Sequence, residues 1–278
     1  MKRFGPLDVK VPAVGQGTWN LEQDDRGEAI AALRRGLDLG LTHVDTAEMY
    51  GNGEVEEMVA EAIAGRRDEV FLVSKVLPGN ASRNGAIAAC ERSLKRLRTD
   101  RLDCYLLHWP GHHPLEETLA GFEDLRSKGS IRSYGVSNFD EALLQRAVAI
   151  AGEGRIACNQ VLYHLEERHA DAALLPLCEK LGVALVGYSP FGSGSFPSAQ
   201  TRGGRALAEV ARAHGATARQ VALAFLIRRP SLFAIPKSAR VSHTEENAGA
   251  LKLRLSEAEL AKIDAAFPVR RRRELPTL

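Results

Sequence analysis

Eight short apolar segments recur along the chain, and stretches with the apolar period of a helix separate most of them. Each segment stops at a polar residue or a glycine, and together they span residues 13–17, 42–45, 70–75, 102–108, 131–137, 155–160, 183–188 and 232–237. Parallel strands need a crossover connection, usually a helix, so this alternation predicts a parallel sheet in an α/β protein. A closed (β/α)8 TIM barrel accounts for eight strands in a chain of 278 residues.

The segments between the strands carry helix signals of their own. Ser82 suits the N-cap of one helix, and Ser256 opens a capping box at the start of the last one. Two further helices are predicted over residues 205–214 and 217–228, before the last strand. No proline- or serine-rich hinge divides the chain, so we predict one barrel domain over residues 1–278.

A doubly wound open sheet is the alternative architecture. Its dinucleotide fingerprint needs three glycines after the first strand, and this chain has Gly15 and Gly17 without the third. The missing glycine favours the barrel.

Charge and composition exclude several classes of function. The net charge of +2 argues against an electrostatic nucleic-acid binder. The longest apolar run, residues 221–227, is far shorter than the roughly 20 residues of a membrane-spanning helix, and no export leader is evident. We therefore expect a cytoplasmic protein without nucleic-acid or membrane partners. The four cysteines and the adjacent His112 and His113 lack metal-ligand spacing, so no metal is expected, and the arginines at 270–273 are interpreted as a solvated tail.

Polar side chains stand at the carboxyl ends of the predicted strands. Active sites of this barrel type form at that end, and a charged or amide group there is costly to bury unless it pairs or binds a ligand. The groups in question are Asp45, Lys75, His108, Asn138, Gln160, Tyr188 and Lys237. Their convergence predicts a functional mouth on the barrel.

Four residues at this mouth suit general acid catalysis. Tyr50, five residues beyond Asp45, is a weak acid on its own, but a neighbouring ammonium lowers the pKa of a tyrosine. Lys75 is expected to supply that charge, and Asp45 to hold the ammonium in place. His108 is expected to orient or polarise the group that Tyr50 protonates. The sequence has no nucleophile–base pair for acyl transfer and no His-x-His on the first strand for a metal hydrolase.

The opposite side of the mouth has the features of a phosphate site. Residues 235–240 end the last strand and lead into a helix, and barrels often bind phosphate at such a helix N-terminus. Lys237, Ser238 and Arg240 add cationic and hydroxyl donors there. The small-residue loop at 189–195 is expected to fold over the phosphate.

In combination these residues resemble the aldo-keto reductases over nearly the whole chain. The resemblance is carried by GQGTW (15–19), DTAEMYG (45–51), SK (74–75), LHWP (107–110), GVSNF (135–139), NQ (159–160), YSP (188–190) and IPKS (235–238). The variant at 45–50, with NQVLYH at 159–164, is most similar to bacterial members that reduce methylglyoxal. The catalytic residues implied by the resemblance are Asp45, Tyr50, Lys75 and His108.

The resemblance also implies that the protein binds NADPH in an extended form, without a Rossmann domain. Tyr188 would stack on the nicotinamide. The other implied contacts are Thr18 and Asp45 at the ribose, Ser137, Asn138 and Gln160 at the carboxamide, Ser189, Phe191 and Ser193 along the pyrophosphate, Lys237 and Ser238 at the 2′-phosphate, and Glu246 and Asn247 near the adenine. Many relatives carry arginine where this chain has His243, so either His243 or Arg240 is left to meet the 2′-phosphate.

We therefore predict a monomeric enzyme that reduces small aldehydes and ketones with NADPH, with Tyr50 as the general acid. Trp19, Met49 and Trp109 would line its substrate pocket, by the same resemblance. Methylglyoxal-like 2-oxoaldehydes and aromatic aldehydes are the expected substrates, because too few residues follow the last helix to build a long lid. The alternative is a cofactor-binding, redox-sensing regulator on the same barrel with little turnover, and the complete set of four catalytic residues argues against it.

Overall fold

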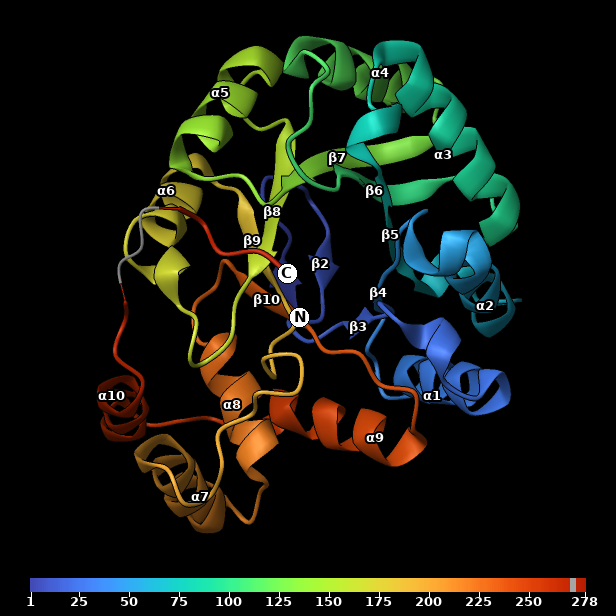
Figure 1. Cartoon of the computed structure of the whole chain (residues 1–278). Coiled ribbons are helices and arrows are strands. Elements are labelled where there is room, and N and C mark those ends of the chain that lie inside the picture. Colours follow the sequence, from blue (N-terminus) through green and yellow to red (C-terminus); the bar gives the residue numbers. More distant parts are fainter. Residues whose placement is uncertain (271–273) are drawn as a thin grey trace.

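The computed structural model describes residues 1–270 and 274–278, so most of the predicted solvated tail at 270–273 lies outside the described residues. Its main sheet consists of parallel strands, and Figure 1 shows from one end the ring that they form. The strands are β3 (Gln16–Gly17), β4 (His43–Asp45), β5 (Phe71–Val76), β6 (Leu102–Leu107), β7 (Ile131–Ser137), β8 (Ile156–Leu162), β9 (Ala184–Tyr188) and β10 (Leu232–Ile235). They pair in chain order from β3 to β10, as short helical crossovers require.

The two edges of this sheet meet, which closes it into a barrel. The Gly15 N–H donates to the carbonyl of Ala234 at 2.8 Å, and the Gly17 N–H donates to the carbonyl of Pro236 at 3.1 Å. Gly17 permits this approach, because a Cβ atom at its position would lie 2.5 Å from the carbonyl oxygen of Ile235. The predicted (β/α)8 barrel is confirmed.

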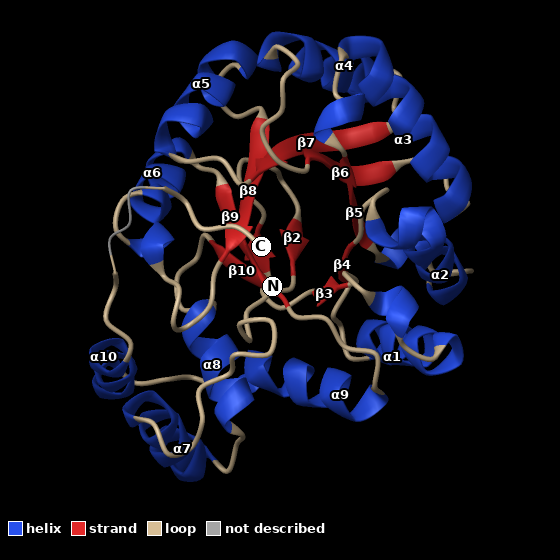
Figure 2. Cartoon of the chain, viewed as in Figure 1, coloured by secondary structure: helices blue, strands red, loops and turns tan. Residues whose placement is uncertain are grey.

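Helices surround the barrel (Figure 2). Those that complete the eight βα units are α1 (Arg26–Asp38), α2 (Glu54–Ala62), α3 (Arg83–Leu97), α4 (Leu115–Ser127), α5 (Glu141–Ala151), α6 (Leu174–Leu181), α8 (Ala218–Leu226) and α9 (Val241–Gly249). Two others, α7 (Arg202–His214) and α10 (Glu257–Ala266), pack against each other outside this ring. The predicted N-cap at Ser82 and the capping box at Ser256 are both present. None of the helices in the described part of the chain is long and apolar enough to cross a membrane.

A short hairpin closes the amino end of the barrel, and the sequence pattern did not predict it. It consists of β1 (Lys2–Arg3) and β2 (Lys10–Val11), which pair antiparallel. Phe4, between the two strands, packs against the rings of Phe71 and Phe233 inside the barrel. Strands of two residues are too short to show a period of two. The apolar Phe4 was therefore the only sequence feature that indicated this hairpin.

The period of two along each strand decides which side chains reach the mouth. In β5, Phe71 and Val73 pack in the barrel interior, and Lys75 continues their series at the carboxyl end. The intervening residues pack beneath the helices instead. His108 follows Leu106 of β6 in the same way. Because all the barrel strands are parallel, the inward side chains at their carboxyl ends lie together at one end of the barrel.

Candidate active site

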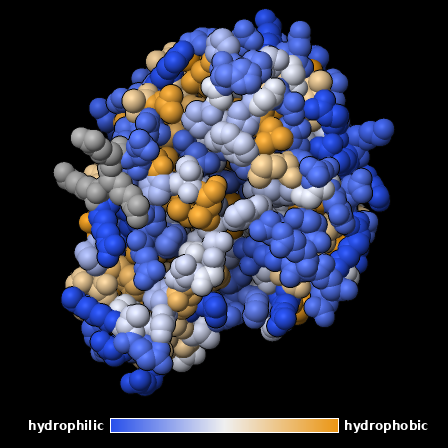
Figure 3. All heavy atoms as spheres, viewed as in Figure 1, coloured by the Kyte–Doolittle hydropathy of each residue, from blue (hydrophilic) through white to orange (hydrophobic). Residues whose placement is uncertain are grey.

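A cavity of about 370 Å³ opens at the carboxyl ends of the strands, on the face where Figure 3 shows a hollow beside an apolar patch. Most of the predicted site residues line it, namely Thr18, Trp19, Asp45, Met49, Tyr50, His108, Trp109, Ser137, Asn138, Gln160, Tyr188, Ser189, Phe191, Ser193 and Lys237. Lys75 lies behind the lining, in contact with Asp45 and Tyr50. The predicted residues that do not line the cavity are Ser238, Arg240, His243, Glu246 and Asn247.

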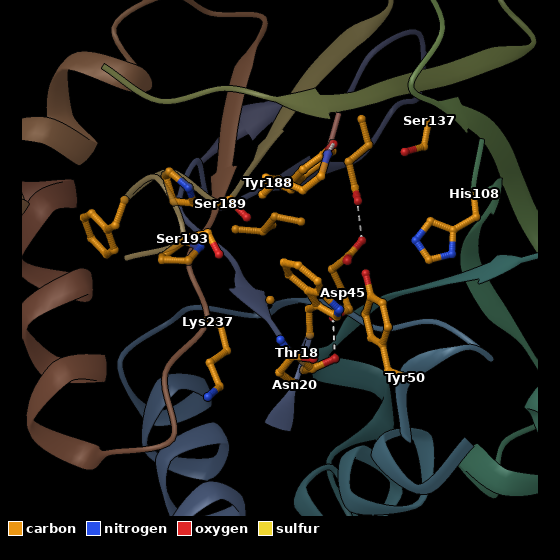
Figure 4. Close-up of a pocket in the computed structure, with 18 of the residues that line it drawn as sticks. Thr18, Asn20, Asp45, Tyr50, His108, Ser137, Tyr188, Ser189, Ser193 and Lys237 are labelled. Atoms are coloured by element: carbon orange, nitrogen blue, oxygen red, sulfur yellow. Dashed lines mark hydrogen bonds between the residues drawn. The ribbon is translucent and has the colours of Figure 1, made fainter. Parts of the chain in front are cut away.

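Lys75 is the centre of a hydrogen-bonded cluster at the floor of this cavity. Its fully buried ammonium donates to Asp45 Oδ1 at 2.5 Å, to the carbonyl of Thr46 at 2.8 Å and to the Tyr50 hydroxyl at 3.1 Å. The second carboxylate oxygen of Asp45 accepts from Gln160 Nε2 at 2.8 Å (Figure 4). All three ammonium protons are used, so the position of Lys75 relative to the phenol is fixed.

A tight turn after β4 brings Tyr50 to this cluster. The turn is η2 (Tyr50–Gly53), in which Gly51 and Gly53 have φ values of 53° and 97°. Left-handed backbone at these positions suits glycine and lets the chain reverse into α2. The Tyr50 hydroxyl then points toward His108, whose ring lies edge-on to it with the centroids 5.7 Å apart (Figure 4).

Burial and charge act in opposite directions on the ionisable groups of this cluster. Burial raises the pKa of Tyr50 above its ordinary value of 10, and the Lys75 ammonium lowers that pKa by less. The expected net lowering of the Tyr50 pKa is therefore wrong, because the phenol is more deeply buried than its place in a loop suggested. Burial also lowers the pKa of Lys75, but Asp45 and Tyr50 together raise it above its ordinary value.

His108 is neutral in this environment. Burial, followed by the charge of Lys75, lowers its pKa to about 2. A neutral imidazole carries one N–H and one acceptor nitrogen, so it can donate a hydrogen bond without adding charge. Its Nδ1 atom is buried and has no hydrogen-bond partner within the described residues.

Asn138 and Tyr188 form the wall opposite Tyr50. The Tyr188 hydroxyl donates to Asn138 Oδ1 at 3.0 Å, and Asn138 Nδ2 donates to the carbonyl of His108 at 3.2 Å. Asn138 has a φ of 59°, a left-handed conformation that asparagine tolerates better than most residues, and this turns its amide toward the mouth. The Leu278 N–H reaches the Tyr188 hydroxyl at 3.4 Å, so the short tail still contributes to the cavity lining.

The predicted phosphate residues lie at the far end of the cavity, around the start of α9. Lys237 lines the cavity, and its ammonium is paired with the Asp24 carboxylate. The Ser238 hydroxyl accepts from the N–H of Arg240 at 3.2 Å and donates to its carbonyl at 2.9 Å, which stabilises the turn into α9. His243 is exposed in the first turn of that helix.

Glu246 and Asn247 lie further along α9. The Glu246 carboxylate accepts from the Thr217 hydroxyl at 2.6 Å, which ties α9 to the start of α8, and Asn247 is buried. The structure thus brings Lys237 to the cavity and leaves both of these residues on the neighbouring helix.

Aromatic contacts hold the loop after β9 beside the cavity. The rings of Phe191 and Phe196 meet edge-on with their centroids 5.8 Å apart. The Arg219 guanidinium lies over both, at 5.7 Å and 5.0 Å. These contacts fix the end of the loop that carries Ser189 and Ser193 into the cavity lining.

Comparisons with known proteins place this geometry in a family. A sequence model of the aldo/keto reductase family matches residues 13–267. The chain belongs to the aldo/keto reductase family. A methylglyoxal reductase of Escherichia coli K12 is 47% identical over 263 residues, which cover 94% of this chain and 93% of that protein. A glyoxal reductase of Bacillus subtilis is 32% identical over 257 residues, or 92% of this chain and 89% of that protein.

The fold of this aldo/keto reductase matches solved structures of the family. An aldo-keto reductase from Klebsiella pneumoniae, crystallised in complex with NADPH, has a TM-score of 0.92 and 43% identity, and the match covers 100% of both chains. The barrel predicted from the strand pattern is therefore also the fold of this Klebsiella reductase, which was crystallised with NADPH.

The aromatic residues expected at the substrate pocket stand at the rim of the cavity. Trp19 and Trp109 are 37% and 36% exposed, and Met49 is half-buried beside them. Such exposure excludes a packing role in the core for the two tryptophans.

Some residues of the cavity were not assigned from the sequence. They are Gly17, Asn20, Pro190, Gly194, Ile235, Pro236 and Leu278. Most are next to an assigned residue in the chain. The strand pattern predicted one residue at each strand end, and these neighbours line the cavity as well. Leu278 had no such neighbour, and no signal in the sequence pointed to it.

The described part of the chain contains no cluster that resembles a metal centre. In residues 1–270 and 274–278, no group of three or more His, Cys, Asp and Glu side chains is placed to hold a metal ion. The rings of His112 and His113 lie 4.2 Å apart in the loop after β6.

Proposed function

We propose that this aldo/keto reductase reduces small aldehydes and ketones to alcohols with NADPH, and that it acts as a monomer. The observation that carries the proposal is the buried Lys75 ammonium, hydrogen-bonded to both Asp45 and Tyr50 beneath an open cavity. This arrangement holds a neutral phenol beside the neutral imidazole of His108. Two neutral hydrogen-bond donors are suited to receiving the negative charge that develops on a carbonyl oxygen.

The residues around the cavity fit the two ends of NADPH. Tyr188 offers an aromatic face, and Asn138 and Gln160 offer side-chain amides for a carboxamide. At the other end Lys237 offers an ammonium close to the start of α9, where a phosphate is favoured. When bound, NADPH supplies the hydride that reduces the carbonyl carbon. The remaining residues that we assign to the cofactor are Thr18, Asp45, Ser137, Ser189, Phe191, Ser193, Ser238, Arg240, Glu246 and Asn247.

Tyr50 is the proposed acid. It gives its phenolic proton to the carbonyl oxygen, and because an alkoxide is far more basic than a phenolate, the raised pKa of Tyr50 does not oppose this step. The Lys75 ammonium, 3.1 Å from the phenolic oxygen, stabilises the phenolate that remains. Asp45 keeps that lysine charged and in place. His108 orients the substrate oxygen by donating one hydrogen bond.

The rim of the cavity favours small, activated carbonyl compounds. Trp19, Met49 and Trp109 present apolar surface, and the cavity of about 370 Å³ must also admit part of the cofactor. The relatives named as methylglyoxal and glyoxal reductases support 2-oxoaldehydes as the substrate class. These relatives do not support the alternative of a redox-sensing regulator, because both are named as enzymes that reduce a carbonyl compound.

The test is a panel of carbonyl compounds with NADPH and NADH, followed by absorbance of the reduced cofactor. We expect kcat/KM to be highest for methylglyoxal and nitrobenzaldehyde with NADPH. Binding of NADPH without turnover of any compound would favour the regulator and overturn the proposal. Equal kcat/KM with NADH and NADPH would remove the assignment of the 2′-phosphate site.

A further inference from the structure

The ammonium at the phosphate end of the cavity is already paired with a carboxylate. Lys237 follows β10, and its Nζ donates to Asp24, which follows the short turn η1 (Leu21–Gln23) between β3 and α1. Both side chains are partly exposed, at 34% for Lys237 and 35% for Asp24. Figure 4 shows the Lys237 side chain directed away from Ser189 and Ser193. Lys237 lines the cavity and Asp24 does not, so the pair draws the charge out of the groove.

Three other acidic side chains around this end have partners of their own. Glu245 pairs with Arg35 on α1, and Glu246 accepts from Thr217 on α8. Asp25, next to Asp24, caps α1 by accepting from the N–H of Glu28 at 2.8 Å. Asp24 is the carboxylate paired with Lys237, so a phosphate that approaches Lys237 meets it.

We infer that Asp24 sets the cofactor preference of this enzyme by competing with the 2′-phosphate for Lys237, so that it weakens NADPH binding and leaves NADH binding unchanged. The inference rests on the proposed binding of NADPH. A phosphate monoester carries a charge of about −1.5 to −2 near neutral pH, and it must displace the carboxylate and then remain beside it. NADH has no group at that position, so its binding leaves the pair intact.

The size of the effect follows from the exposure of the pair. A partly exposed ion pair, with the added repulsion between carboxylate and phosphate, corresponds to a change of about two- to tenfold in affinity at low salt. Added salt screens both contributions, so the effect shrinks as ionic strength rises. Asp24 is thus a specificity-determining residue rather than a catalytic residue.

The experiment measures nucleotide binding rather than turnover. Quenching of the fluorescence of Trp19 and Trp109, which line the cavity, reports the Kd of NADPH and NADH. Titration calorimetry with 2′-AMP and with 5′-AMP isolates the phosphate end. Asp24→Asn should tighten NADPH and 2′-AMP about two- to tenfold and leave NADH and 5′-AMP unchanged. The matched control is Asp25→Asn, which removes the same charge one residue away and keeps the α1 cap, because asparagine caps as well as aspartate.

A double variant tests whether Asp24 acts through Lys237. In a Lys237→Met background, Asp24→Asn should lose most of its effect, because the group for which it competes is gone. NADPH binding that is unchanged in Asp24→Asn would overturn the inference. Weaker binding would also overturn it, and would show that Asp24 positions Lys237 for the phosphate. Failure of the unmodified protein to bind either dinucleotide would overturn the proposed function as well, so the two failures are distinguishable.

Discussion

Replacement of Lys75 by methionine should destabilise the protein strongly, because it leaves a charge without its partner. The Lys75 side chain is fully buried, and Asp45 would keep only the Gln160 amide as a side-chain partner for its carboxylate. Removing one member of a buried ion pair costs about 3–5 kcal/mol. An unfolding entropy of about 2.1 cal/mol/K per residue gives about 0.6 kcal/mol/K for 278 residues, so Tm should fall by about 5–9 °C.

Thermal unfolding followed by circular dichroism measures this loss. The control is Lys237→Met, the same substitution in a pair that is about one-third exposed, which should lower Tm by less than about 2 °C. The double variant Lys75→Met with Asp45→Asn removes the stranded carboxylate and should recover part of the loss. Equal losses for the two lysine variants would refute the reasoning that burial makes the Lys75–Asp45 pair costly to break.

Three further outcomes are expected. His43 is buried with a pKa lowered by burial to about 4, so stability is full above the unfolded value of about 6.5 and falls as the pH drops toward 4. In urea unfolding, the free energy of unfolding of the protein, relative to that of His43→Leu, should fall by about 1.6 kcal/mol from pH 6.5 to pH 5. A constant difference between the two would contradict this. For the 2′-phosphate, Arg240→Ala should strongly reduce the preference for NADPH over NADH, and His243→Ala should leave it nearly intact. A preference that weakens from about pH 6 to 8 and is restored by His243→Arg would assign the contact to His243. Among substrates, small aldehydes should have the highest kcat/KM. A steroid ketone with a higher kcat/KM than every small aldehyde would refute the preference for small substrates.

The strand ends were predictable because the barrel turns a one-dimensional pattern into a shared location. Phe71, Val73 and Lys75 alternate with residues under the helices, so an apolar series that ends in a lysine already indicates an inward, buried charge. His108 follows the inward Leu106 in the same way. Once parallel strands were inferred, the meeting of these side chains at one mouth followed from topology alone.

Other features depend on contacts that no local pattern encodes. Whether the Tyr50 pKa is raised or lowered depends on how completely the surrounding loops exclude water. The sequence showed only that Lys75 lies at the same mouth, and its charge alone would lower that pKa. Asp24 and Lys237 lie 213 positions apart, and their pairing requires the closure of the barrel. The hairpin around Phe4 is too short for periodicity, and Leu278 reaches the mouth without a motif.

The most direct test of the central claim is the turnover of Tyr50→Phe with methylglyoxal and NADPH. This substitution removes the phenolic proton and keeps the ring beside His108. If Tyr50 is the general acid, kcat should fall by about 10²–10⁴-fold, while the Kd of NADPH stays within about twofold of the unmodified protein. A variant that binds NADPH normally and retains more than half of the original kcat would contradict the account.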